Sequence, residues 1–527
     1  MNLRRLKLYA VALMLAAAAL AQKPIQLRPV QIDSGKLLGV LTADQKVVAY
    51  KGIPYAAPPV GDLRWRPPQP VGRWKHILFA RNFGPHCIQF GGYADMVFHD
   101  PGPSEDCLTL NVWAPVPAAK HPAPLPVMVW IYGGGDTTGG TSEERQSGEF
   151  LAHRGVIVVS MNYRLGVFGF MALPELTAES SNHASGNYGL MDQTAAIAWV
   201  RRNIAAFGGD PANITLFGES AGSQAVSAQM ASPIAKGLFS KAIGESGAIF
   251  SSFSMTLPTR EQAEQADGAW AERVFGSSRL FYLRTLTADE VLQKAMSKNT
   301  QPPRFQPDID GLFLPDSVAN IYAAGQQAHI PVLGGWNANE SRASGKPTAA
   351  SFTAQAQQEF GADANAFLAV YPATSDAEAL QSANDYAGDK FIAFSTWAWL
   401  EAQVKTGGAP VYRYFLDLGS PGDRNHPASM GAFHSNDIEY IFGTLDSRPE
   451  MAIRPEDRAL SELMGEYWTN FAKTGDPNGP GLPRWLPYSA AGGWQVMHLD
   501  AIPSSQPDAL RGRDLFLDRQ WGRATAK

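Results

Sequence analysis

Four continuous apolar runs constrain the fold of this chain more than any other feature. They are residues 127–132, 156–161, 214–217 and 331–334. Runs of this kind are typical of strands that are buried on both faces of a sheet. Between the second and the third run, residues 190–207 contain alanines, isoleucines and a tryptophan in an order that indicates a well-packed helix. This repetition of strand, helix and strand predicts a mostly parallel α/β sheet.

The segments on either side of this core predict its completion. Two short strand-like runs, 37–41 and 47–52, are separated by a polar turn and predict an antiparallel lead-in. Residues 348–404 are rich in Ala, Gln and Glu and predict helices that form a cap packed on the sheet. Length alone suggests about three domains. No repeat, charge block or low-complexity linker interrupts residues 22–527, so we predict a single domain there.

The first residues predict an export signal. A basic segment at 4–7 precedes an apolar run at 8–20, and Ala19 and Ala21 supply small residues for cleavage after Ala21. The apolar run is about thirteen residues long, shorter than the roughly twenty that a membrane-spanning helix needs. We therefore predict a signal peptide over residues 1–21 and a secreted or periplasmic protein. An uncleaved anchor is the alternative, and no other stretch is apolar enough to cross a bilayer.

Charge and cysteine content narrow the class of protein. The net charge is −5, with 44 basic and 49 acidic residues, so nothing indicates a polyanionic partner, and nucleic-acid binding is disfavoured. The chain has only two cysteines, Cys87 and Cys107. In an oxidising compartment they would pair as a disulfide. Two independent buried thiols are the alternative.

The strongest local signal surrounds Ser220, which lies in the sequence Gly-Glu-Ser-Ala-Gly at 218–222. The motif follows the apolar run 214–217 and precedes residues 223–230, which can form a helix, so it has the strand–turn–helix context of a nucleophile elbow. A serine on such a tight turn has strained backbone angles, and the flanking glycines remove side chains that would collide. The helix directs free N–H groups at the reacting centre. We therefore predict that Ser220 is a nucleophile; a plain glycine-rich turn is the alternative.

Acyl transfer also requires N–H groups that stabilise a negatively charged carbonyl oxygen. One is expected from Ala221, the residue after the nucleophile. The apolar run 127–132 is followed by three glycines at 133–135, a loop without side chains that can supply the others. A plain turn or a phosphate-binding loop is the alternative. No Gly-x-Gly-x-x-Gly or Gly-Lys-Ser/Thr sequence follows, so nucleotide binding is disfavoured.

A histidine base should follow the nucleophile, because α/β-hydrolases have their triad in the order serine, acid, histidine. The histidines that follow Ser220 are His329, His426, His434 and His498. His434 lies in a loop after the strand-like run 411–416, where a catalytic histidine is expected. The others lie before a strand, in a polar turn, or in a short apolar run near the chain end. The pattern therefore favours His434.

The acid should lie at the carboxyl end of a strand. Glu340 follows the run 331–335 through a short loop. Asp308, Asp310 and Asp316 are competitors in a polar segment that has no buried strand before it. Position favours Glu340, but the residues themselves leave the choice between these acids open.

Further segments carry a resemblance to a known family. They occur in order at residues 50–56, 104–108, 110–113, 162–166, 186–193, 207–211, 467–472 and 475–478. Together with the serine motif they resemble the type-B carboxylesterase family, which includes the cholinesterases. The likeness covers nearly the whole chain after residue 39. It implies an α/β-hydrolase fold and the hydrolysis of carboxylic esters.

The family's motifs assign roles to residues of this sequence. The resemblance implies a catalytic triad of Ser220, Glu340 and His434. It implies oxyanion-hole donors at Gly134, Gly135 and Ala221. It also implies supporting roles for Ser246 and Glu219 and a disulfide between Cys87 and Cys107. No metal or organic cofactor is expected, and no metal-binding motif such as His-Glu-x-x-His is present.

Three departures from the family pattern bear on the substrate. The Cys87–Cys107 loop has no tryptophan, whereas cholinesterases stack the choline cation on one there. Asp136 follows the three glycines where an aromatic or aliphatic residue is common, and Ser341 replaces a glycine after the acid. We therefore do not expect acetylcholine as the substrate. Asp136 either alters the polarity of the acyl pocket or points to solvent.

The sequence thus predicts a carboxylic ester hydrolase that acts on small-molecule esters through an acyl-enzyme intermediate. One alternative keeps the triad but changes the bond to a carbamate, a lactone or an amide. The other is a non-catalytic binding protein of the same family, in which a nucleophile would be missing; here all three triad residues are present.

Overall fold

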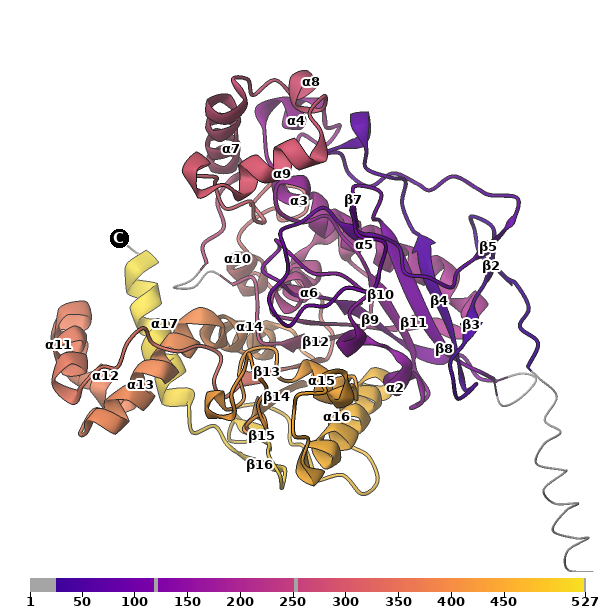
Figure 1. Ribbon diagram of the computed structural model, residues 1–527. Helices are drawn as coiled ribbons and strands as arrows, with labels where there is room; N and C mark the ends of the chain where they lie inside the picture. Colours follow the sequence, from indigo (N-terminus) through magenta and orange to yellow (C-terminus); the bar gives the residue numbers. More distant parts are fainter. Residues whose placement is uncertain (1–24, 118–121, 251–254, 526–527) are drawn as a thin grey trace, which may run out of the picture.

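The computed structural model describes residues 25–117, 122–250 and 255–525 (Figure 1). The predicted signal peptide, residues 1–21, lies outside the described residues, so it stays a prediction. Within the described residues, no helix combines the length and the apolar character needed to cross a membrane.

The core of the molecule is a sheet of eleven strands in the order β16-β15-β14-β13-β12-β11-β9-β10-β8-β4-β3. In chain order the strands are β3 (Val40–Leu41), β4 (Val47–Pro54), β8 (Thr109–Pro115), β9 (Leu125–Ile131), β10 (Ile157–Met161), β11 (Gly209–Glu219), β12 (Lys241–Glu245), β13 (Val332–Asn337), β14 (Val411–Leu416), β15 (Gln495–Leu499) and β16 (Ser504–Pro507). The strands from β10 to β15 pair in parallel, and the strands at both ends pair antiparallel. The prediction of a mostly parallel sheet with an antiparallel lead-in is confirmed.

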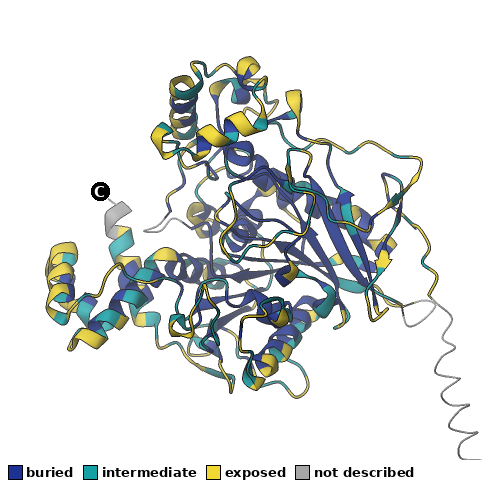
Figure 2. Cartoon of the chain, viewed as in Figure 1, coloured by how far each residue is buried: buried dark blue, intermediate teal, exposed yellow. Residues whose placement is uncertain are grey.

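The apolar runs form strands because helices cover the sheet on both faces. Figure 1 shows α5 (Tyr188–Asn203) and α6 (Ala221–Ala231) above the strands, and α2 (Glu149–Ala152) and α16 (Pro455–Thr474) below them. Every residue of β10 is buried, and the central strands are mostly dark blue in Figure 2. A strand between two helix layers has no polar face, which explains why its sequence does not alternate.

The first predicted strand divides in two. Lys36–Leu38 (β2) joins a small sheet with β1 (Val30–Gln31) and β5 (Ile77–Phe79), while β3 pairs with β4. The break falls at Gly39, where a Cβ would lie 2.7 Å from the carbonyl oxygen of Ala49. The chain changes sheets there because only glycine fits this close approach.

The helices predicted for residues 348–404 are present. They are α11 (Ala349–Phe360), α12 (Ala364–Val370), α13 (Asp376–Gly388) and α14 (Phe394–Thr406). They share a second apolar cluster with α17 (Arg511–Thr525), and Trp336 of β13 joins this cluster to the sheet. Figure 1 shows α11, α12 and α13 projecting from the side of the molecule. The prediction that residues 22–527 form one domain stays a prediction.

A second group of helices was not predicted. It consists of α7 (Arg260–Phe275), α8 (Leu280–Leu283) and α9 (Ala288–Met296), and it lies at the top of Figure 1. Thr259 and Thr287 cap α7 and α9, and each forms a capping box with the third residue of its helix. The capping boxes are a sequence signal for these two helices, and a search for apolar runs alone does not detect it.

Candidate active site

Ser220 lies on the sharp turn between β11 and α6. Its φ is 55° and its ψ is −122°, a backbone conformation that costs a non-glycine residue roughly 1–3 kcal/mol. A Cβ at Gly222 would lie 2.0 Å from the carbonyl oxygen of Ile131, and one at Gly218 would lie 2.6 Å from a backbone carbon of Gly222. The two glycines therefore permit the turn by removing these collisions, as the sequence predicts.

A continuous line of hydrogen-bonding groups runs from Ser220 into the protein. His434 Nε2 lies 2.9 Å from Ser220 Oγ, and His434 Nδ1 lies 2.6 Å from Glu340 Oε2. The other carboxylate oxygen of Glu340 accepts hydrogen bonds from the Ser246 hydroxyl at 2.5 Å and the Asn337 N–H at 2.7 Å. These contacts fix the carboxylate, and the carboxylate orients the imidazole. The structure thus brings the predicted triad residues and Ser246 together.

The strand order of the sheet brings Glu340 and His434 together. Glu340 follows β13 and His434 follows β14, and parallel strands end at the same edge of a sheet. The two loops are also joined directly, because Asn337 Nδ2 donates a hydrogen bond to the Phe433 carbonyl at 2.9 Å. The backbone N–H of Asn339 donates to a carbonyl of the histidine loop at the same distance. These bonds hold the acid and the histidine in register.

The other histidines after the serine have different surroundings. His329 lies 2.9 Å from a carbonyl oxygen of its own segment, and His498 on β15 lies 2.7 Å from the carboxylate of Asp417, which follows β14. His426 stacks on Phe433 with the ring centroids 4.2 Å apart and contributes to the cavity wall. Of the four candidates, only His434 forms a hydrogen bond to Ser220 in the described part of the chain.

The competing acids also lie elsewhere. Asp310 and Asp316 accept hydrogen bonds from backbone N–H groups of their own loops. Asp308 is buried against Gly186, where a Cβ would lie 2.4 Å from its carboxylate. Among these acids Glu340 alone bonds to the histidine in the residues that the structure describes.

The glycine loop after β9 faces the serine. Gly134 has a φ of 110° and Gly135 a φ of 65°, and a Cβ on Gly134 would lie 2.1 Å from the Thr138 carbonyl oxygen. Across the described segments, the backbone N–H groups of Gly134, Gly135 and Ala221 donate no internal hydrogen bond. Ala221 is the first residue of α6, where N–H groups lack helical acceptors. The three groups that the sequence predicts as oxyanion donors are therefore free to bind a ligand oxygen.

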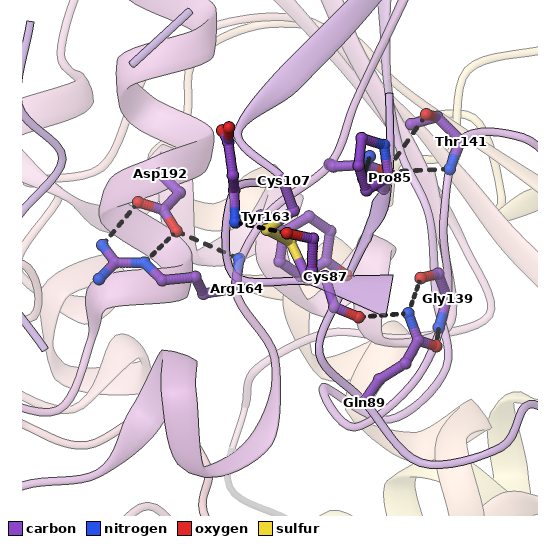
Figure 3. The surroundings of a disulfide bond; sticks show 12 residues. Pro85, Cys87, Gln89, Cys107, Gly139, Thr141, Tyr163, Arg164 and Asp192 are labelled. Carbon is purple, nitrogen blue, oxygen red and sulfur yellow. Dashed lines mark hydrogen bonds and ion pairs between the residues drawn. A yellow bond between two sulfur atoms is a disulfide. The ribbon is translucent and has the colours of Figure 1, made fainter. Parts of the chain in front are cut away.

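The disulfide supports this loop. Cys87 and Cys107 are bonded across a separation of 20 residues, which confirms the predicted pairing (Figure 3). Two residues beyond Cys87, the side chain of Gln89 accepts a hydrogen bond from the Gly139 N–H and donates one to the Gly139 carbonyl, both at 2.7 Å. The closed Cys87–Cys107 loop thereby holds the end of the glycine loop from outside the sheet.

Carboxylates dominate the electrostatics at His434. Glu219 Oε1 lies 3.4 Å from His434 Nε2 and accepts no hydrogen bond in the described structure. Burial lowers the pKa of His434, but the carboxylates of Glu219 and Glu340 more than offset this and raise the pKa to about 9. Burial raises the pKa of Glu219 to about 8. The His434 side chain is still 27% exposed to the cavity. The imidazole of His434 is therefore next to carboxylates that favour its protonated form, and it also faces the cavity in which a substrate would bind.

A cavity of about 550 Å³ opens above the serine. Its wall includes Phe391, which is 40% exposed and lies with its ring 5.1 Å from the His434 ring. Phe391 belongs to a π-helical turn, Asp389–Ala393, between α13 and α14. The sequence reading missed this residue, since a π turn within a helical segment has no distinct periodicity. Asp136 is only 6% exposed, so the alternative in which it points to solvent is wrong.

The strand order, the serine turn after β11 and the later positions of Glu340 and His434 define this protein as an α/β-hydrolase. A solved structure of PNB esterase superimposes on it with a TM-score of 0.79 at 35% sequence identity, covering 93% of this chain and 99% of that one.

The family follows from comparisons with known sequences. The model of the carboxylesterase family matches residues 26–515. The chain is 38% identical to para-nitrobenzyl esterase of Bacillus subtilis (strain 168), over 84% of this chain and 89% of that protein. It is 35% identical to fumonisin B1 esterase of Sphingopyxis macrogoltabida, over 87% and 84%, and 31% identical to acetylcholinesterase of Bungarus fasciatus, over 92% and 84%. The chain belongs to the carboxylesterase family, and it is a carboxylesterase.

Proposed function

We propose that this carboxylesterase hydrolyses small-molecule esters through a covalent acyl-enzyme on Ser220. The observation that carries the proposal is the unbroken sequence of contacts from Ser220 Oγ to His434 Nε2 at 2.9 Å and from His434 Nδ1 to Glu340 at 2.6 Å. A serine is a weak nucleophile at neutral pH and needs an adjacent base to accept its proton.

In the first half of the reaction, Ser220 Oγ attacks the ester carbonyl carbon while His434 Nε2 accepts the serine proton. The carbonyl oxygen becomes negatively charged and is stabilised by the N–H groups of Gly134, Gly135 and Ala221. The bond to the alcohol oxygen then breaks, and the imidazolium donates its proton to that oxygen. The alcohol leaves, and the acyl group stays on the serine.

In the second half, a water molecule takes the place of the alcohol. His434 accepts a proton from this water as its oxygen attacks the acyl carbon, and the same N–H groups stabilise the second oxyanion. Collapse of this intermediate releases the carboxylic acid and returns the proton to Ser220. Glu340 keeps Nδ1 protonated and stabilises the imidazolium in both halves, while Ser246 holds the carboxylate in place.

The proposal is tested by trapping the acyl group. Mixing the enzyme with excess 4-nitrophenyl butyrate should release a burst of nitrophenol close to one equivalent, and mass spectrometry after an acid quench should find a butyryl group on Ser220. Ser220→Ala should give neither burst nor adduct. Ser341→Ala, which changes another serine of the same cavity wall, is the matched control and should keep both. Turnover by Ser220→Ala at the rate of the unaltered enzyme, or an adduct on another side chain, would refute the assignment.

A further inference from the structure

The active-site cavity contains three arginines with different surroundings. Arg145 is buried, and its guanidinium lies 2.7 Å from Asp95 and 2.8 Å from Glu143. Arg304 and Arg342 also line the cavity, but both are exposed to it. Arg145 thus forms ion pairs with acids of the protein and is not available to pair with a charged substrate.

The acids on the cavity wall face basic groups other than Arg304 and Arg342. Asp95 contacts the buried arginine and also lies 3.5 Å from Arg448. Glu219 and Glu340 both face His434, at 3.4 and 2.6 Å. Asp95 therefore pairs with two other arginines, and Glu219 and Glu340 share His434, so none of these three acids forms an ion pair with the two exposed arginines in the described structure.

Arg304 and Arg342 differ from Arg145 because neither lies in a close ion pair among the described residues. In the described parts of the chain, neither forms an ion pair with a carboxylate. The guanidinium of Arg342 donates a hydrogen bond to the Ser429 carbonyl, which leaves most of its five N–H donors free. Arg304 follows Pro303, whose own φ is fixed, and precedes Phe305, whose side chain is buried. Both cations thus line the cavity, and a hydrogen bond to the backbone restrains Arg342 there.

The position of Arg304 strengthens any contact that it makes with an anion. Arg304 and Thr137 line the active-site cavity and also a neighbouring cavity of about 190 Å³. The walls of this second cavity are mainly apolar and include Ile88, Phe90, Leu165, Val167, Leu292 and Phe305. An apolar wall lowers the local dielectric constant, so a charge-assisted hydrogen bond there is stronger than one in bulk water.

Asp136 is the carboxyl group that interacts with Arg304 through its charge. Burial raises the pKa of Asp136 to about 7, and Arg304 lowers it in part. Because burial favours its neutral form, Asp136 is a weaker counter-ion for Arg304 than an exposed aspartate would be.

We propose that Arg304 and Arg342 bind a carboxylate of the substrate, so that the enzyme prefers esters whose acyl or alcohol part carries a negative charge. The inference rests on the function proposed above, because it names the substrate class of the same cavity. Guanidinium groups suit this task, since their planar fork forms paired hydrogen bonds with a carboxylate. Because Arg145 already forms ion pairs with acids of the protein, an anionic substrate would form its ion pair with Arg304 or Arg342.

Two pairs of esters of similar shape test the preference and separate its two sources. Monoethyl glutarate against ethyl pentanoate places the charge on the acyl part, and 4-acetoxybenzoate against 4-acetoxybenzamide places it on the alcohol part. We expect kcat/KM to be about 10- to 100-fold higher for the charged member of at least one pair, the range that charge-assisted hydrogen bonds provide. The ratio should fall as salt is raised from 0.05 to 0.5 M, because ions screen exposed charges.

The variants Arg304→Gln, Arg342→Gln and their combination assign the preference to these residues. The double variant should reduce the charged-to-neutral ratio to about one while it changes kcat/KM for the neutral esters less than threefold. Arg304→Lys should keep part of the ratio, because the charge remains but the fork is lost. Arg201→Gln is the matched control, an exposed arginine on α5 outside the cavity wall, and should change nothing.

The outcomes separate this inference from the proposed function. A ratio near one in the unaltered enzyme for both pairs, or a ratio that the double variant keeps, overturns the preference. In both cases a butyryl adduct on Ser220 leaves the proposed function standing. Absence of the adduct together with absence of turnover for all four esters overturns both proposals.

Discussion

The carboxyl edge of the sheet and the cluster around α12 are built differently. At the edge, Ser220, Ser246 and Ser435 have φ values of 55°, 52° and 68°, and buried oxygens of Glu219 and Glu245 accept no hydrogen bond in the described structure. In the cluster, aromatic rings pack closely instead. The centroid of Phe367 lies 4.6, 5.0 and 5.7 Å from those of Phe360, Tyr386 and Phe516.

This difference separates reactivity from stability. Strained serines and buried carboxylate oxygens without a hydrogen bond raise the free energy of the folded state, and such groups persist where they serve chemistry. Close-packed aromatic rings lower that free energy and add no reactive group. We therefore expect substitutions at the edge to change turnover with little effect on unfolding, and substitutions in the cluster to do the reverse.

The largest effect is expected at the edge, from His434→Gln. The variant removes the base but keeps a polar side chain of similar size, so kcat/KM for 4-nitrophenyl butyrate should fall on the order of 10⁴-fold or more. The midpoint of thermal unfolding should stay within a few degrees of that of the unaltered enzyme. A variant that unfolds much earlier would show that this region also stabilises the fold, and the proposed contrast would fail.

The next effect belongs to the aromatic cluster. Phe367 is 2% exposed, and Phe367→Ala should lower the free energy of unfolding by about 3–5 kcal/mol, the usual loss for a buried aromatic ring. Urea unfolding measures this loss. At temperatures where the variant is folded, its kcat/KM should match that of the unaltered enzyme. The conservative variant Phe367→Leu should lose less stability, which would link the effect to the volume removed.

Loss of the disulfide should change both the stability of the fold and the turnover. Reduction of Cys87–Cys107, or the double variant Cys87→Ser, Cys107→Ser, should lower the free energy of unfolding by about 3 kcal/mol in the chain-entropy model for a loop of this length. Because Gln89 joins this loop to Gly139, kcat should also fall, by less than about tenfold. Gln89→Ala should reproduce the loss of kcat without the full loss of stability; a normal kcat in both variants would contradict the mechanical link.

The smallest effect is a shift in the pH profile from Glu219→Gln. The reaction requires neutral His434, so activity should fall as the pH drops through its pKa, which the neighbouring carboxylates raise to about 9. Removing the charge of Glu219 takes away part of this increase, so the acidic limb of kcat/KM should move about one unit to lower pH. An unchanged limb would show that Glu219 does not act on the histidine through its charge.

The sequence predicts the parts of the fold that depend on burial. The runs of β9, β10, β11 and β13 are apolar because both faces of each strand are covered, so the sequence alone locates them. Strand β8 was not predicted as a strand, since Asn111 lies in its middle. Its side chain is buried, where it accepts a hydrogen bond from the Gly52 N–H and donates one to Ser160. A polar residue satisfied by distant groups has no local signature.

The candidate site was predictable to the extent that it depends on local turns. Ser220 needs glycines beside it, so its sequence neighbourhood identifies it. Glu340 and His434 meet only because β13 and β14 end at the same edge, and the residues alone left competitors open. Arg304 and Phe391 were missed because they reach the cavity from a loop and from a π turn. Neither segment has a periodicity or a motif that points to the serine.

Strands β11 and β12 lie side by side, each ends in Gly-Glu with Glu219 opposite Glu245, and a serine follows each strand. Both serines have a positive φ, 55° for Ser220 and 52° for Ser246. Of the two, only Ser220 forms a hydrogen bond with an imidazole in the described structure, whereas the Ser246 hydroxyl donates a hydrogen bond to Glu340. Among the described residues, three serines have a positive φ, Ser220, Ser246 and Ser435, so backbone strain alone does not identify the nucleophile. The nucleophile is thus distinguished by the imidazole beside it, and the corresponding serine one strand away positions the acid instead.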